Sequence, residues 1–351
     1  MGVSMAFCLS AYGTIFTIMS ISDTKILPNP PRLFQSLIAG FDAITNHFGL
    51  ALFPIFLDLF LWLGPRLRIY RLMKGFFESM TTLPGMDDPD LSNLMKINRD
   101  LWLLVSEKLN LFSILRTYPV GVPSLMVSIQ PGVTPVGARL DFEVSSISSL
   151  GIGFVTLMLV GLLFGTIYFW AVAQVTLSGK TVGADAFRQC IWAAYQVILL
   201  SLFWFTLLVV ISIPVSCLIS AFAFGGAAGG NIGLFIGGGV LVWLLFPLVF
   251  SPHGIFIDHK EAWSSILNSL RLVRYTFPGT TLLFLIVVVL SEGLDVLWRV
   301  PKDASWLTLV GLAGHGFIST GLLAATFIYY RDATQWVEEV LKQVKHNAFL
   351  Q

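Results

Sequence analysis

The sequence predicts an all-α polytopic membrane protein, a transmembrane helical bundle of about six spans with amphipathic interfacial elbow helices. Of its 351 residues, 56% are hydrophobic and only 12% are charged, whereas soluble domains carry about 25% charged residues. A chain this apolar cannot cover itself with polar surface in water, so lipid is expected to be its main solvent. Its long continuous apolar runs favour helices over a membrane barrel, whose strands alternate in polarity.

Six apolar runs approach the length of about 20 residues that a helix needs to cross the hydrocarbon core. The first run, residues 48–64, is short, and a five-span membrane domain is predicted over residues 150–330. The runs within that domain cover about 150–175, 191–222, 232–250, 280–297 and 306–330. Pro214 interrupts the run 191–222. Because every backbone amide in lipid needs an internal partner, each run is expected to be helical.

Residues 1–47 form an N-terminal segment whose first 20 residues leave three alternatives open. These residues are apolar, but no Lys or Arg precedes them, as the positive region of a secretory signal would require. The alternatives are a seventh span, a peripheral helix, and translated sequence upstream of a true start at Met19.

Residues 65–149 separate the first span from the others and are expected to be extracytoplasmic. An amphipathic helix is predicted after Asp90, whose carboxylate can cap it, and this helix is expected to lie on the membrane or on the bundle. Four prolines exclude a regular helix over residues 118–149 and leave short strands or an ordered loop. The segment from Asp90 to Ser149 is expected to pack on the membrane domain through its apolar side chains, namely Leu101, Trp102, Leu111, Phe112, Leu125 and Met126.

Lys and Arg gather in the loops on one side of the predicted spans, while the opposite short loops hold only Arg299 and Lys302. The positive-inside rule therefore predicts a cytoplasmic N-terminal segment and a cytoplasmic tail over residues 331–351. The expected location is a cell membrane, the bacterial inner membrane, with the amphipathic tail lying along its surface. A basic stripe at the start of the extracytoplasmic segment contradicts this topology at one point; it comprises Arg66, Arg68, Arg71 and Lys74.

Three short stretches on the predicted cytoplasmic side precede spans and mix a polar face with aromatic or aliphatic residues. They are residues 31–44, 182–188 and 260–274. Interfacial helices have this composition, so one hypothesis is three helical hairpins, each introduced by an elbow helix in the membrane plane. The alternative is that any loop between spans tends to be amphipathic.

One of these stretches carries a resemblance to a known family. The residues are Phe250-Ser251-Pro252, Ile257-Asp258, Glu261-Ala262-Trp263 and Asn268 to Arg274. Together they resemble a signature loop of a broad family of six-span bacterial membrane proteins, which includes the membrane domain fused to some glycerophosphodiester phosphodiesterases. The likeness is clearest over residues 251–330. That family has no established common activity, so the resemblance implies a fold rather than a function, and no part of the chain matches a phosphodiesterase catalytic domain.

Four ionisable residues fall within predicted spans: Asp58, His315, Glu292 and Asp295. A central Asp costs about 2.5–3.5 kcal/mol on insertion scales, so Asp58 is a candidate proton or cation ligand. The alternative is a carboxyl that points into the bundle, bonds to a polar group on another span and has no open water path. His315, flanked by glycines, is a candidate partner for Asp58 or Glu292. Asp295 shares a helix face with Glu292, and Arg299 follows it by one turn, which predicts an ion-pair ladder.

Several other residues are expected to be structural. Glycine pairs four residues apart are candidates for close helix packing, at Gly161 with Gly165 and at Gly233 with Gly237. The loop residues His253, Asp258 and His259 fit no metal motif and are expected to be wet on the cytoplasmic side. The three cysteines, Cys8, Cys190 and Cys217, show no metal or redox spacing and are expected to be small buried hydrophobes.

No motif of an enzyme, cofactor or metal site is present, and a net charge of +1 without a basic block argues against nucleic acid as a partner. The predicted function is that of a non-enzymatic membrane scaffold, accessory or lipid-handling component. Its expected partners are membrane lipid and other membrane proteins. The alternative is a secondary transporter or channel, because transporters use intramembrane ionisable groups and helices broken near the midplane.

Overall fold

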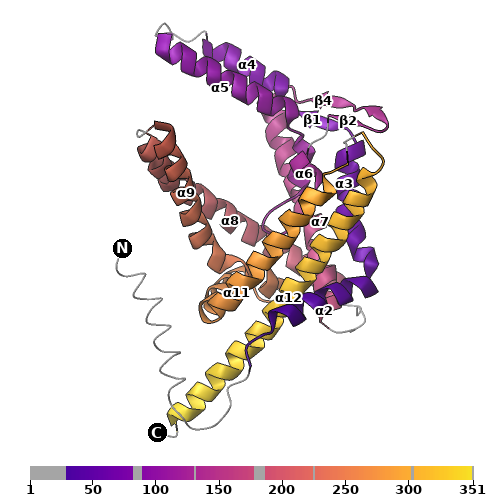
Figure 1. Ribbon diagram of the computed structural model, residues 1–351, viewed down its shortest axis with the longest axis vertical. Coiled ribbons are helices and arrows are strands. Elements are labelled where there is room, and N and C mark those ends of the chain that lie inside the picture. The colour runs from indigo at the N-terminus through magenta and orange to yellow at the C-terminus, as the bar shows by residue number, and fades with distance from the viewer. Residues whose placement is uncertain are drawn as a thin grey trace. The chain divides into compact units, whose positions relative to one another are not determined.

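The computed structural model describes residues 29–81, 89–129, 132–177, 186–223, 226–301 and 304–349. The possible N-terminal span and Met19 lie outside these ranges. The chain divides into two units, residues 31–334 and the pair 1–30 with 335–351. The six predicted apolar runs belong to the first unit, and Figure 1 labels the helices that they form.

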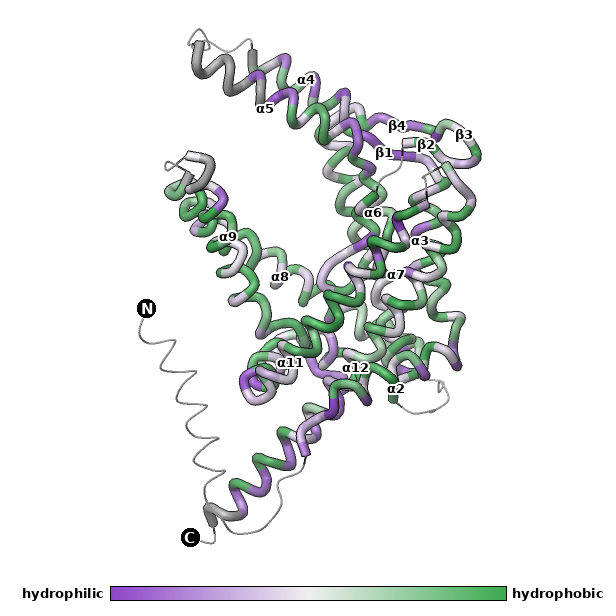
Figure 2. Tube along the Cα trace, viewed as in Figure 1, coloured by the Kyte–Doolittle hydropathy of each residue, from purple (hydrophilic) through white to green (hydrophobic). Residues whose placement is uncertain are grey.

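Within these described ranges, five helices are long and apolar enough to cross a membrane, and a bent pair of helices makes a sixth candidate. This confirms the predicted all-α polytopic bundle, and Figure 2 shows apolar residues dominating these helices. The five are α7 (Ile147–Thr176), α8 (Ala186–Ala223), α9 (Gly226–Leu245) continued by η3 (Phe246–Leu248) and α10 (Ser251–Ile257), α11 (Ala262–Trp298) and α12 (Thr308–Phe349). The bent pair is α2 (Leu33–Asn46) with η1 (Phe48–Ala51) and α3 (Leu52–Leu63).

The first predicted elbow is present, because α2 meets the η1–α3 run at 93°. Gly40 of α2 lies so close to the backbone of Ala325 that a Cβ there would stand 2.5 Å from its nitrogen. The third predicted elbow is the first half of α11, which a kink with non-helical backbone at Thr276 separates from the span. Most of the second, residues 182–188, lies outside the described ranges.

Pro214 does not break its span, which corrects the sequence interpretation. Helix α8 is continuous from Ala186 to Ala223 with Pro214 inside it. A membrane helix tolerates a proline because neighbouring groups can satisfy the one carbonyl that loses its partner. The tail also continues a helix, since α12 runs on to Phe349; that it lies along the membrane stays a prediction.

Residues 65–149, the last three of which begin α7, are called the inter-span segment below. Its elements are β1 (Arg66–Arg68), α4 (Tyr70–Thr81), α5 (Pro89–Lys108), η2 (Leu111–Leu115), α6 (Met126–Ile129), β2 (Val133–Thr134), β3 (Gly137–Ala138) and β4 (Asp141–Glu143). β1 pairs in parallel with β4, and β2 pairs antiparallel with β3. The predicted helix after Asp90 and the predicted short strands are therefore both present.

Two arginines of the basic stripe are neutralised inside the inter-span segment. Arg66 and Arg68 lie on the same face of β1, since side chains alternate along a strand. Arg66 binds Asp141 through two hydrogen bonds of 2.7 Å, and Arg68 adds a third of 3.0 Å. Burial alone would raise the pKa of Asp141, but the hydrogen bonds and charges of Arg66 and Arg68 outweigh it and lower that pKa. The positive-inside rule counts Lys and Arg whatever their partners, so the conflict between this stripe and the predicted topology stays.

The second half of the inter-span segment enters the core of the membrane domain. Val120, Val122 and Leu125 are fully buried, in one cluster with aromatic residues of α3, α7 and α12. The expected packing is therefore confirmed for this half. It is wrong for α5, because Leu101 and Trp102 are 58% and 49% exposed.

The predicted glycine pairs both mark close approaches, but with different partners. Gly233 and Gly237 of α9 pack on Ile219 of α8, as expected for two helices. Gly161 and Gly165 of α7 instead receive the chain of the inter-span segment. A Cβ at Gly165 would stand 2.7 Å from the Gly121 Cα, and one at Gly161 would stand 2.6 Å from a carbonyl oxygen.

The cysteines of α8 are less buried than expected. Cys190 is half-buried and Cys217 is exposed, while Cys8 lies outside the described residues. In a membrane span an exposed position faces lipid, so a thiol there needs no cover from the protein.

Candidate functional site

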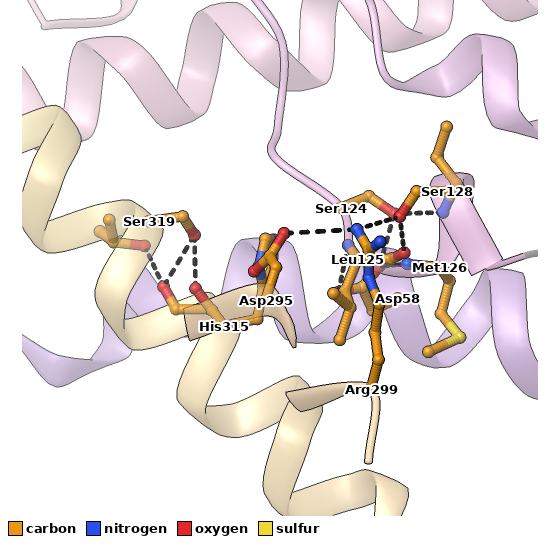
Figure 3. Close-up of polar contacts among 12 residues, drawn as sticks. Asp58, Ser124, Leu125, Met126, Ser128, Asp295, Arg299, His315 and Ser319 are labelled. Atoms are coloured by element: carbon orange, nitrogen blue, oxygen red, sulfur yellow. Dashed lines mark hydrogen bonds and ion pairs between the residues drawn. The ribbon is translucent and has the colours of Figure 1, made fainter. Parts of the chain in front are cut away.

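Asp58 of α3 is fully buried and holds the inter-span segment (Figure 3). Its carboxylate accepts hydrogen bonds from the Ser124 hydroxyl at 2.5 Å, the Met126 amide at 3.0 Å and the Leu125 amide at 3.1 Å. The two amides are the unpaired donors at the start of α6, and a carboxylate is well suited to cap such donors. Asp58 therefore points into the protein, as predicted. Its partner, however, is the inter-span segment and not another span.

His315 of α12 pairs with Asp295 of α11 and not with Asp58 or Glu292. The Nδ1 atom of His315 lies 2.8 Å from Asp295 Oδ1, and because a carboxylate only accepts, Nδ1 is the donor. The helices approach closely here because a Cβ at Gly311 would stand 2.6 Å from the Trp298 carbonyl oxygen. The glycine-rich surroundings of His315 thus do serve close packing, between α11 and α12.

Arg299 connects this pair to the inter-span segment. It lies 3.8 Å from Asp295, which confirms that part of the predicted ladder, while Glu292 is exposed and takes no part. A guanidinium nitrogen of Arg299 also donates to the Ser128 hydroxyl of α6 at 2.9 Å (Figure 3). Helix α6 is consequently bound at its start by α3 and near its end by α11.

These polar groups serve to join parts of the protein. All three donors that reach Asp58 come from one short stretch, and neither Asp58 nor His315 lines the large cavity described next. Sequence reasoning missed Ser124 and Ser128. The sequence Pro123-Ser124 could have indicated them, because a serine after a proline and before the apolar residues Leu125 and Met126 is typical of a helix N-cap.

A cavity of about 310 Å³ lies where the inter-span segment meets the spans. Its walls are apolar, with Phe169 from α7, Trp204 from α8, Phe284 from α11 and Leu322 from α12. The chain from Arg116 to Pro123 closes one side. Ligand pockets typically measure about 300–1,000 Å³ and are mostly apolar with few polar groups, so this cavity has the size and character of a small ligand site.

No protein-family model, curated protein or solved structure matches the chain. The resemblance of residues 251–330 to the six-span family therefore stays a prediction, and the cavity must be interpreted from its own residues.

His253 lines this cavity and is buried, so the expectation of a wet loop is wrong. Residues 251–257 form α10, and the His253 ring packs 4.6 Å from Phe327 between ring centroids. Its Nε2 lies 2.9 Å from the Thr326 hydroxyl, which itself donates to the Leu323 carbonyl. Thr326 must then accept, so Nε2 carries the proton and Nδ1 is a bare acceptor. Among the described residues Nδ1 has no hydrogen-bond partner.

The other two loop residues are structural. Asp258 accepts hydrogen bonds from the Tyr330 hydroxyl at 2.7 Å and from Lys260 at 2.8 Å. His259 takes a positive φ of 51° directly after it and packs edge-on against Trp192. Within the described ranges, no group of three or more His, Cys, Asp or Glu side chains is placed to hold a metal ion.

Among the described residues that line the cavity, Arg116 is the only charged one. Its side chain is exposed and reaches the Ser124 carbonyl at 3.4 Å, and it makes no ion pair with any carboxylate in the described part of the chain. A guanidinium carries five donors in a planar fork. Most of those donors remain available to an anion at this side of the cavity.

Proposed function

We propose that this integral membrane protein is a non-enzymatic, lipid-handling component that accommodates an anionic amphiphile in its cavity. The observation that carries the proposal is the cavity itself, which combines four apolar walls with one uncompensated cation at Arg116. An acyl chain matches the walls, and a phosphate or carboxylate head group matches the guanidinium, which binds such groups through two parallel hydrogen bonds.

The arrangement of the ionisable groups favours this proposal over transport. Asp58 and His315 motivated the transporter alternative, yet both are engaged in hydrogen bonds outside the cavity. The predicted break at Pro214 is absent from the continuous helix α8. A transported ion or proton would need these groups beside a water-filled path.

The test is to extract the full chain into polymer-bounded native membrane discs and identify the retained lipids by mass spectrometry. Val287→Trp places an indole in the cavity that Val287 lines. Val288→Trp is the matched control, because Val288 is the next residue on α11 and is 54% exposed. Arg116→Gln removes the charge while keeping a polar side chain.

We expect wild type and Val288→Trp to retain the same tightly bound anionic lipid, and Val287→Trp to lose it. Arg116→Gln is expected to abolish the preference for anionic over zwitterionic lipid. Identical lipid retention in all four proteins would refute the proposal, since the lipid would then only surround the spans. A solute flux in liposomes that disappears in Asp58→Asn would instead support the transporter.

A further inference from the structure

The α4–α5 hairpin is rooted at the ends of two candidate spans. Strand β1 begins at Arg66, directly after α3 ends at Leu63, and leads into α4. Its partner β4 ends at Glu143, shortly before α7 begins at Ile147. The ion pairs between β1 and β4 join these two connections. The base of the hairpin is therefore held beside the ends of these two candidate spans.

Helix α4 presents a polar face to its surroundings. Its exposed side chains include Arg71, Lys74, Glu78 and Ser79. Lys74 and Glu78 form an exposed ion pair of 3.9 Å one helical turn apart. Phe77 is buried, Phe76 is 48% exposed beside this polar face, and α4 packs on α5. This composition suits a helix whose free face is in water.

Helix α5 presents an apolar face instead. Leu101, Leu104 and Val105 are 58%, 53% and 42% exposed, and Trp102 beside them is 49% exposed. Positions 101, 104, 105 and 108 follow the i, i+3, i+4, i+7 spacing of a single stripe, so Lys108 extends the same face. The buried side of this part of α5 is marked by Ser106. The exposed apolar residues are consequently not part of the protein core.

We infer that α5 lies in the head-group boundary of the bilayer at this end of the spans, with α4 above it in water. Three observations indicate that lipid covers the apolar face of α5. The root of the hairpin lies beside the ends of two candidate spans, Trp102 at the edge of the stripe is of the kind enriched at membrane interfaces, and Lys108 on the stripe can pair with lipid phosphates. Four large apolar side chains are otherwise left in water. The inference does not depend on the cavity.

The test measures the surroundings of single labelled positions in lipid nanodiscs that contain one copy of the full chain. Cys8, Cys190 and Cys217 are replaced by alanine, and a bimane fluorophore is attached at Leu101→Cys. Lys74→Cys, on the exposed polar face of α4, is the matched control. Leu104→Cys is a second site on the same stripe, 53% exposed, in case the first variant does not fold. Lipids with a nitroxide near the head group and aqueous iodide are the two quenchers.

We expect the nitroxide lipid to quench the label at Leu101 at least three-fold more strongly than the label at Lys74, with the opposite order for iodide. Equal iodide quenching at both positions would place the α5 face in water and overturn the inference. Protection of the Leu101 label from both quenchers would also overturn it, because a protein surface would then cover this face.

Discussion

The hydrogen bonds of Asp58 predict a small loss of stability for one substitution and a large loss for another. Oδ1 accepts from Ser124 and Met126, and Oδ2 accepts from Leu125. In Asp58→Asn the amide oxygen can replace Oδ1 and keep two of the three bonds. The amide nitrogen then faces the Leu125 N–H, and two donors meet. Asp58→Asn is therefore expected to lose one of the three hydrogen bonds.

The magnitudes follow from the number of donors left without a partner. An inter-helix hydrogen bond in a membrane averages about 0.6 kcal/mol, whereas a buried donor left unsatisfied costs about 1–3 kcal/mol. Asp58→Ala strands three donors, so we expect its free energy of unfolding to fall by at least about 3 kcal/mol. Asp58→Asn strands one, so we expect a loss of about 1–3 kcal/mol.

The assay is reversible unfolding in mixed dodecyl maltoside and SDS micelles, with hydrogen exchange of residues 120–129 as a local measure. Glu292→Ala is the control, because it removes an exposed carboxylate of α11 and should change stability by no more than about 0.5 kcal/mol. The reasoning fails if Asp58→Ala unfolds like wild type, or if exchange at residues 120–129 does not accelerate.

Three further predictions concern other contacts. Gly165→Ala should lower the free energy of unfolding by about 1–3 kcal/mol in the same assay, because its new Cβ would stand 2.7 Å from backbone. Gly151→Ala, whose Cβ would have nothing within 4 Å, should not lower the free energy of unfolding. The pKa of Asp141 is lowered in the folded state, so its stabilising effect is present above pH about 4 and is lost as the pH falls through the folded-state pKa. Hydrogen exchange at residues 66–68 of wild type should therefore accelerate as the pH falls through that range. In Asp141→Asn the same residues should exchange fast at every pH. A double-mutant cycle with His315→Ala and Asp295→Asn should show coupling of at least about 0.5 kcal/mol, and additive effects would show that the 2.8 Å contact contributes nothing.

The spans could be predicted from sequence because long apolar runs have one stable solution in lipid, the helix. The same rule explains the error at Pro214. In a soluble protein a proline usually breaks or kinks a helix. Within a membrane span the helix continues through it, because backbone groups left without hydrogen bonds in lipid cost more free energy than in water. The actual interruptions, at the α2–α3 bend and at Thr276 in α11, lie just after the stretches expected to be amphipathic elbows, residues 31–44 and 260–274.

The candidate site could be predicted only in part. The identity of Asp58 as a buried hydrogen-bonded carboxyl followed from the cost of a charge in hydrocarbon. Its partner did not, because Ser124 is 66 residues away and lies in a proline-rich stretch that has the composition of a surface loop. His253 was misplaced for a related reason. A polar residue beside Pro252 and Gly254 looks like a loop residue, and only the packing of Phe327 and Thr326 around it shows that it is buried.

Photocrosslinking with an anionic phospholipid that carries a diazirine in its acyl chain tests the central claim most directly. In native membranes the account predicts crosslinked peptides at the cavity walls, with Trp204, Phe284 and Leu322 modified. It also predicts that Val287→Trp suppresses these crosslinks, while those on lipid-facing positions such as Phe235, 84% exposed on α9, remain. Crosslinks confined to exposed positions such as Phe235, with the cavity walls unmodified in wild type, would contradict the account.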